Sequence, residues 1–182
     1  MLVVAEDEQL PVARARAGEQ AAWESLFQRY QLPVYVYVFE LVHDEQTSFD
    51  IVQEAFAAAV RHIASLREDG KFGSWLFGIA HQKCIQRRRK HDREFAALEK
   101  ISNTPEEFSE DPGELLIRHE EESKFMKLLN QLPPAHRAVL LLHFIEDFSL
   151  EEIARITGAN VGTVKSRMYY AKRAMRKLWE EE

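Results

Sequence analysis

The sequence predicts an all-α protein made of two small helical domains, an N-terminal helical bundle and a C-terminal helix-turn-helix domain, joined by a flexible acidic linker. Apolar residues recur at helical spacing along most of the chain. Glycine is sparse, and no stretch combines strand alternation with hairpin turn signals. A segment rich in acids, prolines and serines separates the two helical parts. We place the domains at residues 1–92 and 119–182, with the linker at 93–118.

Composition excludes several classes of protein. The 182 residues are 46% hydrophobic and 30% charged, which is typical of a soluble globular protein. The single cysteine, Cys84, excludes an internal disulfide and favours a reducing compartment; we interpret it as a small core residue. The N-terminus MLVVAEDEQL lacks the basic residues of a signal peptide, and no apolar run approaches the roughly 18 residues of a membrane span. We therefore expect a cytoplasmic protein without direct membrane insertion.

One stretch near the N-terminus resembles a strand. VYVYVF, from Val34 to Phe39, alternates β-branched and aromatic residues. It has no obvious partner strand, however, and the preceding AAWESLFQRY is helical in character. We therefore predict a buried helix that continues past Pro33.

The helix that follows has a clearer start. Thr47 followed by Asp50 fits a capping pattern. Four apolar residues then recur at every fourth position and predict a buried stripe: Ile51, Ala55, Ala59 and Ile63. The polar residues of this helix fall on its other face: Asp50, Gln53 and Glu54. The segment REDGKFGS at 67–74 interrupts the pattern, and helical spacing resumes from Trp75 to Cys84.

The charges of the chain are segregated along the sequence. The formal net charge is −6, yet Lys83–Arg93 contains six basic residues and one acid. Glu94–Glu122 contains ten acids, and Arg155–Trp179 contains seven basic residues and no acid. Two basic stretches that flank an acidic segment predict two anion-binding surfaces joined by a spacer, although any single charged run also fits a solvated helix face.

The C-terminal part contains the signals of a helix-turn-helix. Two helices separated by the Pro-Pro pair at 133–134 lead into it. Ser149 and Glu152 form the S-x-x-E capping box at the start of the next helix. Gly158 lies where that helix must end and the chain must turn sharply. Asn160 is a favourable N-cap for the last helix.

The last helix combines an apolar and a basic face. Its apolar residues are spaced by three and four positions: Val161, Val164, Met168, Ala171, Met175 and Leu178. The residues that this stripe turns outward are Gly162, Thr163, Lys165, Ser166, Arg167, Tyr170 and Arg173. In a helix-turn-helix the second helix enters the major groove, where arginine pairs with guanine while lysine and tyrosine hold phosphates. An amphipathic helix with ordinary surface charge is the simpler alternative, which the lack of any acid disfavours.

These motifs resemble a known family. The segment LPPAHRAVLLLHFIEDFSLEEIARITGANVGTVKSRMYYAKRAMRKL is similar to the C-terminal promoter-binding domain of bacterial sigma factors of the extracytoplasmic-function (ECF) group. In the N-terminal part, DIVQEAF (50–56) and FGSWLFGIA (72–80) resemble two motifs of the same family, and a basic stretch follows them as it does there. The resemblance covers about Ala22 to Leu178, interrupted only by the linker. Two motif sets in the family order are far more specific than either set alone.

The resemblance implies a role for each surface. Three residues would contact core RNA polymerase: Asp50, Gln53 and Glu54. Seven would bind the minus-10 promoter element, with LREDGKFGS as a pocket loop: Lys71, Phe72, Ser74, Gln82, Lys83, Gln86 and Arg87. The outward face of the last helix would bind the minus-35 element through Gly162, Thr163, Lys165, Ser166, Arg167, Tyr170 and Arg173. The family also implies a partner, an anti-sigma factor, in addition to core polymerase and promoter DNA.

The chain departs from the family pattern at a few positions. Where many relatives have I-A-R-N and an Asp four residues later, this sequence has His81-Gln82 and Gln86, which predicts an altered minus-10 preference. Thr47 and Phe49 stand at positions that are commonly acidic. Trp75 fits both a core residue and a wedge against DNA.

The sequence disfavours two other functions. Catalysis is disfavoured because the seven histidines show no H-E-x-x-H spacing and the chain has no C-x-x-C or P-loop motif, so we expect no enzyme, metal or cofactor. A stand-alone repressor or activator would share the C-terminal domain and normally dimerise on its operator. A repressor or activator of this kind would not account for the N-terminal motifs or the acidic linker. The sequence therefore predicts a sigma factor that binds core polymerase, recognises both promoter elements and promotes DNA melting.

Overall fold

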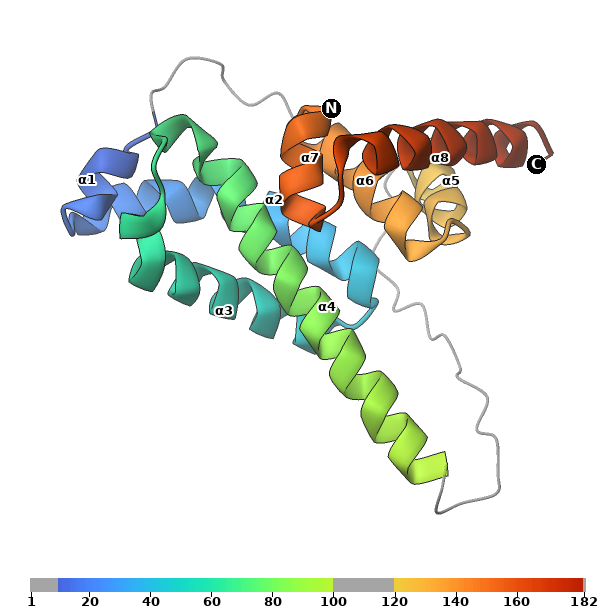
Figure 1. Cartoon of the computed structure of the whole chain (residues 1–182), viewed down its shortest axis with the longest axis horizontal. Coiled ribbons are helices and arrows are strands. Elements are labelled where there is room, and N and C mark those ends of the chain that lie inside the picture. Colours follow the sequence, from blue (N-terminus) through green and yellow to red (C-terminus); the bar gives the residue numbers. More distant parts are fainter. Residues whose placement is uncertain (1–9, 100–119, 182) are drawn as a thin grey trace.

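The computed structural model describes residues 10–99 and 120–181, and Figure 1 shows their arrangement. These residues form helices joined by short connections, and no strand occurs among them. The predicted all-α class is therefore confirmed.

Residues 10–99 of the N-terminal domain form four α-helices. They are α1 (Val12–Arg16), α2 (Gln20–Val42), α3 (Glu45–His62) and α4 (Phe72–Glu99). Two short 3-10 turns, η1 (Ile63–Ser65) and η2 (Asp69–Lys71), connect α3 to α4. As predicted, α2 continues through Pro33 and contains the strand-like segment. Val34, Tyr37 and Val38 are fully buried, and this spacing of three and four is helical.

The start of α3 differs from the sequence prediction. Asp44, not Thr47, is the N-cap: its Oδ1 accepts the Thr47 backbone N–H at 2.7 Å. Thr47 is therefore the third residue inside the helix, and the predicted Thr47–Asp50 cap is wrong. His43 closes α2 in the left-handed conformation, with φ of 55°, so Asp44 follows the turn directly and is the first residue able to cap α3.

The C-terminal domain contains α5 (Glu120–Asn130), α6 (Pro134–Glu146), α7 (Leu150–Thr157) and α8 (Val161–Glu181). The predicted capping box is present at the start of α7, where Ser149 and Glu152 each accept the other's backbone N–H. Gly158 ends α7 with φ of 65°. Asn160 Oδ1 then accepts the Thr163 N–H at 2.7 Å and caps α8. The helix-turn-helix is confirmed in each of its local signals.

The predicted end of the first domain, at residue 92, falls within a helix. Helix α4 continues to Glu99, past residue 92, where the sequence predicts the first domain to end. The remainder of the predicted linker, at 100–118, lies outside the described residues.

The two domains pack directly against each other. Figure 1 shows α7 beside α4 and α6 beside α2, and these are the main contacts between the domains. Phe77 of α4 meets Phe148, which precedes α7, in a T-shaped contact with ring centroids 5.2 Å apart. The buried apolar residues of both domains form one continuous core. This extensive contact was not anticipated from the sequence.

A buried polar pair lies in the N-terminal part of this core. The hydroxyl of Tyr37 and Nδ1 of His81 are 2.7 Å apart, and both side chains are buried. Burial, assisted by the nearby charge of Arg167, lowers the pKa of His81 to about 4. His81 is therefore a neutral group of the interior at neutral pH.

Replacing the true cap of α3 should destabilise the protein more than replacing the predicted one. Asp44→Ala leaves backbone N–H groups of the first turn without an acceptor and should lower the free energy of unfolding by about 1 kcal/mol. Thr47→Ala, measured in the same way, should change it by less than about 0.5 kcal/mol. Urea unfolding followed by circular dichroism measures both. The reverse order of the two effects would contradict the assignment of the cap.

Acid should destabilise the fold through His81. The unfolded chain binds a proton at this side chain below pH 6.5, whereas the folded chain binds one only near pH 4. Stability from this group is therefore complete above pH 6.5 and is lost as the pH falls towards about 4. Glu40, whose pKa burial raises to about 7, acts in the opposite direction.

Comparison with a variant isolates the contribution of His81. In His81→Asn, which does not titrate, the melting temperature should depend less on pH between 4 and 6.5 than in the wild type. Parallel pH profiles of the two proteins would rule out this role. Thermal unfolding at closely spaced pH values gives the result.

Candidate nucleic-acid interfaces

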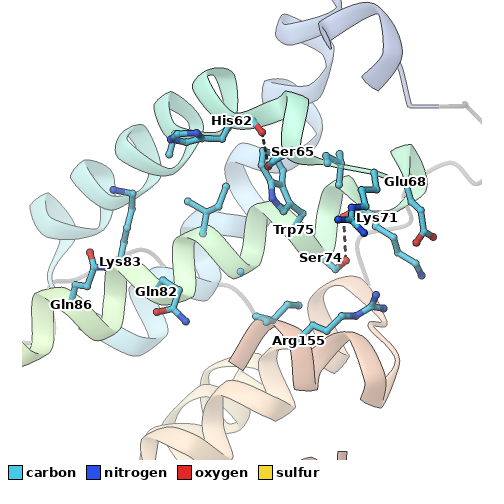
Figure 2. Close-up of a pocket in the computed structure, with 16 residues that line it drawn as sticks. His62, Ser65, Glu68, Lys71, Ser74, Trp75, Gln82, Lys83, Gln86 and Arg155 are labelled. Atoms are coloured by element: carbon cyan, nitrogen blue, oxygen red, sulfur yellow. Dashed lines mark hydrogen bonds between the residues drawn. The ribbon is translucent and has the colours of Figure 1, made fainter. Parts of the chain in front are cut away.

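A cavity of about 680 Å³ opens where the connection between α3 and α4 meets α7. Five of the seven residues predicted for the minus-10 element line it: Lys71, Ser74, Gln82, Lys83 and Gln86. Figure 2 shows these side chains along α4 and its start, with Trp75 among them. The pocket loop expected from LREDGKFGS also reaches the cavity, through Leu66, Arg67 and Glu68. The structure thus brings most of this predicted set together.

Phe72 does not reach the cavity. Its side chain is fully buried, with ring centroids 6.3 Å from Trp23, 5.5 Å from Tyr30 and 6.0 Å from Trp75. Because it packs against one side of Trp75, Phe72 supports the cavity wall from behind. Trp75 itself is half-buried and lines the cavity, so it contributes both to the core and to the open surface.

The lining of the cavity suits a nucleotide. It presents Arg67, Lys71 and Lys83 as cations and the amides of Gln82 and Gln86 as hydrogen-bonding groups. Trp75 adds an aromatic surface to this polar rim. Single-stranded nucleic acids are bound by this combination of positive charge for the backbone and aromatic faces for unstacked bases.

Two predicted DNA contacts share an acidic partner on α3. Lys83 Nζ lies 2.7 Å from Glu54 Oε2, and Arg87 lies 3.5 Å from the other carboxylate oxygen. The hydrogen bond from Lys83 holds the pKa of Glu54 below its ordinary value. One of the residues predicted to contact core polymerase therefore pairs with the predicted DNA surface.

The other two residues of the predicted core-binding face, Asp50 and Gln53, take no part in that pairing. Gln53 is exposed, and Asp50 is half-buried with its carboxylate 3.3 Å from the Gln46 amide nitrogen. The neighbouring Phe49 is 46% exposed, and its ring packs at a tilt against that of Tyr35, with centroids 4.7 Å apart. The outer face of α3 therefore combines polar groups with one exposed aromatic ring.

Helix α8 presents the residues predicted for the minus-35 element. Val164, Met168 and Ala171 are buried, which turns the opposite side of the helix outward. The exposed members of the predicted set are Gly162, Lys165, Ser166, Tyr170 and Arg173, and the half-buried members are Thr163 and Arg167. Thr163 helps to fix the helix start, because its hydroxyl also donates to Asn160 Oδ1 at 2.9 Å.

Sequence reasoning missed three residues at these surfaces. Arg67 was within the predicted pocket loop but was not singled out, although its charge was the available signal. Tyr169 is 62% exposed beside Tyr170, and helical spacing alone does not show which of these two adjacent tyrosines is more exposed. Arg155 reaches the cavity from α7 of the other domain, as Figure 2 shows, and only the folded arrangement reveals it.

Within the described ranges, two further features are not found. No group of three or more His, Cys, Asp or Glu side chains at residues 10–99 or 120–181 is placed to hold a metal ion. None of the helices described by the structure is sufficiently long and apolar to span a bilayer.

Comparison with known proteins supports one family over most of the chain. Residues 26–94 match the family model described as Sigma-70 region 2, and residues 122–175 match Sigma-70, region 4. The RNA polymerase sigma-H factor of Pseudomonas aeruginosa is 32% identical over 185 residues, covering 97% of this chain and 95% of that protein. The ECF RNA polymerase sigma-E factor of Escherichia coli (strain K12) is 32% identical over 177 residues, or 92% of each chain.

A solved structure shares the fold. The sigma factor RpoE from Bartonella quintana, in complex with the anti-sigma factor NepR, superimposes with a TM-score of 0.69 at 22% identity, covering 86% of this chain and 96% of that chain. With both sigma-70 regions in order and relatives matched over nearly their whole length, the chain belongs to the extracytoplasmic-function group of the sigma-70 family of RNA polymerase sigma factors.

Proposed function

We propose that this protein directs core RNA polymerase to promoters by dividing recognition between the cavity beside α4 and the exposed face of α8. The observation that carries the proposal is the presence of two separate surfaces of different design in one chain. One is a cavity with an aromatic wall and a basic rim, and the other is a basic helix face at a helix-turn-helix. A repressor would need only the second.

The face of α8 suits duplex DNA. The N-terminal half of a recognition helix meets base edges in the major groove, and here that half carries Lys165, Ser166 and Arg167. Arg167 is the candidate for bidentate pairing with guanine, while Lys165 and Arg173 suit phosphates. This surface would read the minus-35 element as an intact duplex.

The cavity suits a base that has left the stack. Trp75 offers an aromatic surface, Gln82 and Gln86 offer donors and acceptors for a base edge, and Lys71 and Lys83 offer charge for the backbone. Capture of the minus-10 non-template strand here would favour the melted duplex over the closed one. Because the driving force is binding energy, the protein would promote melting without catalysing a reaction of its own.

Core polymerase would bind the outer face of α3. Asp50 and Gln53 are the members of this face that are not paired with the DNA surface, so they provide the cleaner test of core binding. Glu54 would serve both surfaces, because the cations that it holds are two of the proposed minus-10 contacts. The proposed site of action is the cytoplasm, where core polymerase is found.

An anti-sigma factor is a further proposed partner. The related fold of the Bartonella quintana factor was solved bound to its anti-sigma factor NepR, and its likeness spans 86% of this chain. A partner of this kind would hold the protein inactive until a signal releases it.

The core-binding role is tested by charge reversal on α3. Asp50→Lys should weaken binding to bacterial core polymerase by at least about tenfold, which corresponds to about 1.4 kcal/mol. Glu24→Lys, which makes the same change at an exposed position of α2, is the matched control and should bind core normally. Fluorescence anisotropy of labelled protein titrated with core gives both affinities. Equal affinities of wild type and Asp50→Lys would remove α3 from the proposed interface.

The proposed minus-35 surface makes two kinds of contact with DNA, one to a base and one to phosphate, and substitutions can distinguish them. With holoenzyme, Arg167→Ala should reduce discrimination at one base pair of the element by about 1–3 kcal/mol. Lys165→Ala should instead weaken binding to all sequences and lower the slope of log affinity against log salt by about 1. Arg176→Ala, exposed further along α8, serves as the control. Binding to a set of single-base promoter variants at several salt concentrations distinguishes the two effects; identical profiles for all three variants would contradict the assignment.

A further inference from the structure

Helix α1 contacts the connection between α3 and α4, which forms one wall of the cavity (Figure 1). This helix precedes residues 26–94, the part of the chain that matches Sigma-70 region 2, and it belongs to none of the surfaces assigned above. Arg16 is its last residue. The Nη2 atom of Arg16 donates to the Leu66 carbonyl oxygen at 3.1 Å and to Asp69 Oδ1 at 2.6 Å. One nitrogen thus binds two points of the connection that are three residues apart.

The two bonds enclose a pair of residues that line the cavity. Leu66 and Asp69 lie immediately before and after Arg67 and Glu68 in the chain. Arg67 and Glu68 are both exposed, and both contribute to the cavity wall. An arginine at such a wall suits the backbone of a single strand and can also stack on an unstacked base. Because Arg16 holds the chain on either side of Arg67, it determines where this cation is presented.

Apolar contacts anchor only the two ends of the connection. Leu66 is 7% exposed and Phe72 is fully buried. All five residues between them, at 67–71, are exposed or half-buried. Lys71, the last of the five, is held separately through its hydrogen bond to Glu152. The conformation of the first half of this segment therefore depends on polar contacts, of which Arg16 supplies two.

Helix α1 is a firm base for these contacts. Val12 is fully buried and Ala15 is 2% exposed, so one side of α1 packs into the core. The Nε1 atom of Trp23 donates to the Ala15 carbonyl oxygen at 3.0 Å and ties the end of α1 to α2. The ring of Trp23 also meets that of Phe72, at the start of α4, with centroids 6.3 Å apart. Arg16 thus extends towards the connection from an anchored position.

The exposure of the Arg16–Asp69 pair indicates what it contributes. The two side chains are 34% and 41% exposed, so water and salt screen the pair and it adds little to the stability of the fold. A segment that is already ordered, however, does not have to be ordered at the expense of binding energy when a ligand arrives. The pair should therefore affect DNA recognition more than it affects unfolding.

We infer that Arg16 is a positioning residue for the minus-10 element, which holds residues 66–69 so that Arg67 is presented to the cavity. The inference rests on the proposed assignment of the cavity to that element. Arg16 acts through the connection and does not itself line the cavity. Without Arg16, Arg67 would keep its place in the sequence but lose its fixed position, so the bases beside it would be distinguished less well.

Hydrogen exchange tests the positioning directly. In Arg16→Ala, the backbone amides of residues 66–71 should exchange at least about threefold faster than in the wild type, because local opening no longer breaks the two hydrogen bonds. Arg14→Ala is the matched control: it removes the same charge from the same helix, and Arg14 pairs with Glu19 instead of the connection. Mass spectrometry of peptic fragments gives the rates. Unchanged rates in Arg16→Ala, or equal acceleration in both variants, would overturn the inference.

Base discrimination tests the consequence for DNA. Promoter fragments are first selected from a randomised DNA library by wild-type holoenzyme, and single-base changes are then made in each element. With Arg16→Ala holoenzyme, the loss of affinity caused by minus-10 changes should be at least about threefold smaller than with wild type, whereas minus-35 changes should keep their full effect. Arg14→Ala should behave as wild type in both elements.

The conservative variant separates positioning from loss of the side chain. Both bonds of Arg16 come from one nitrogen, and a lysine ammonium has enough donors to replace both. Arg16→Lys should therefore restore most of the minus-10 discrimination. An Arg16→Lys protein that discriminates no better than Arg16→Ala would overturn the inference.

The outcomes distinguish this inference from the proposed function. Failure of wild-type holoenzyme to select any fragments would contradict the proposed function, while the exchange rates would still decide whether Arg16 holds the connection. Full minus-10 discrimination by Arg16→Ala would overturn only the positioning role. An equal loss of affinity for every fragment would indicate a lost charge alone and would overturn that role as well.

Discussion

Burial of the apolar side of α4 is the constraint on which the rest of the structure depends. Phe72, Leu76, Phe77 and Ala80 are all fully buried, and α4 packs against α2, α3 and α7. Since these residues fix the rotation of the helix, they also determine which side chains face outward. Gln82, Lys83 and Gln86 consequently line the cavity. Helix α4 therefore stabilises the N-terminal domain and forms one wall of its proposed DNA site. It also provides the surface against which α7 of the other domain packs.

Acidic residues explain how a protein of net charge −6 accommodates its basic surfaces. Glu54 pairs with Lys83 and Arg87, and Glu152 pairs with Lys71, so each carboxylate occupies cations that we assign to DNA. Such partly exposed pairs add little stability because water and salt screen them. They do compete with phosphate, since a cation already paired with a carboxylate must give up that partner when DNA binds. The arrangement favours DNA binding only where a partner or a high local density of phosphate displaces the acids.

The fold could be predicted from local sequence signals. The site was harder to predict because it also depends on contacts between residues that are distant in the sequence. The capping box at Ser149, the turn at Gly158 and the helix through Pro33 each depend on a few neighbouring residues, and all are present. The cap of α3 was missed because two polar residues, Asp44 and Thr47, compete for the role, and the turn at His43 decides between them. Phe72 was assigned to DNA because a motif gives the order of residues and not their burial. The position of Arg155 and the contact between the domains depend on how the two domains meet, which local residue spacing does not encode.

The contact between the domains combines apolar burial with charged pairs of unequal exposure. Its apolar part, around Phe77 and Ile156, excludes water and stabilises the contact. Arg29 and Glu146 pair through two hydrogen bonds, and the Glu146 side chain is only 7% exposed. Lys71, which pairs with Glu152, is 39% exposed, so water and salt screen that pair more strongly. The Arg29–Glu146 pair therefore contributes more to the relative orientation of the two domains than the Lys71–Glu152 pair does.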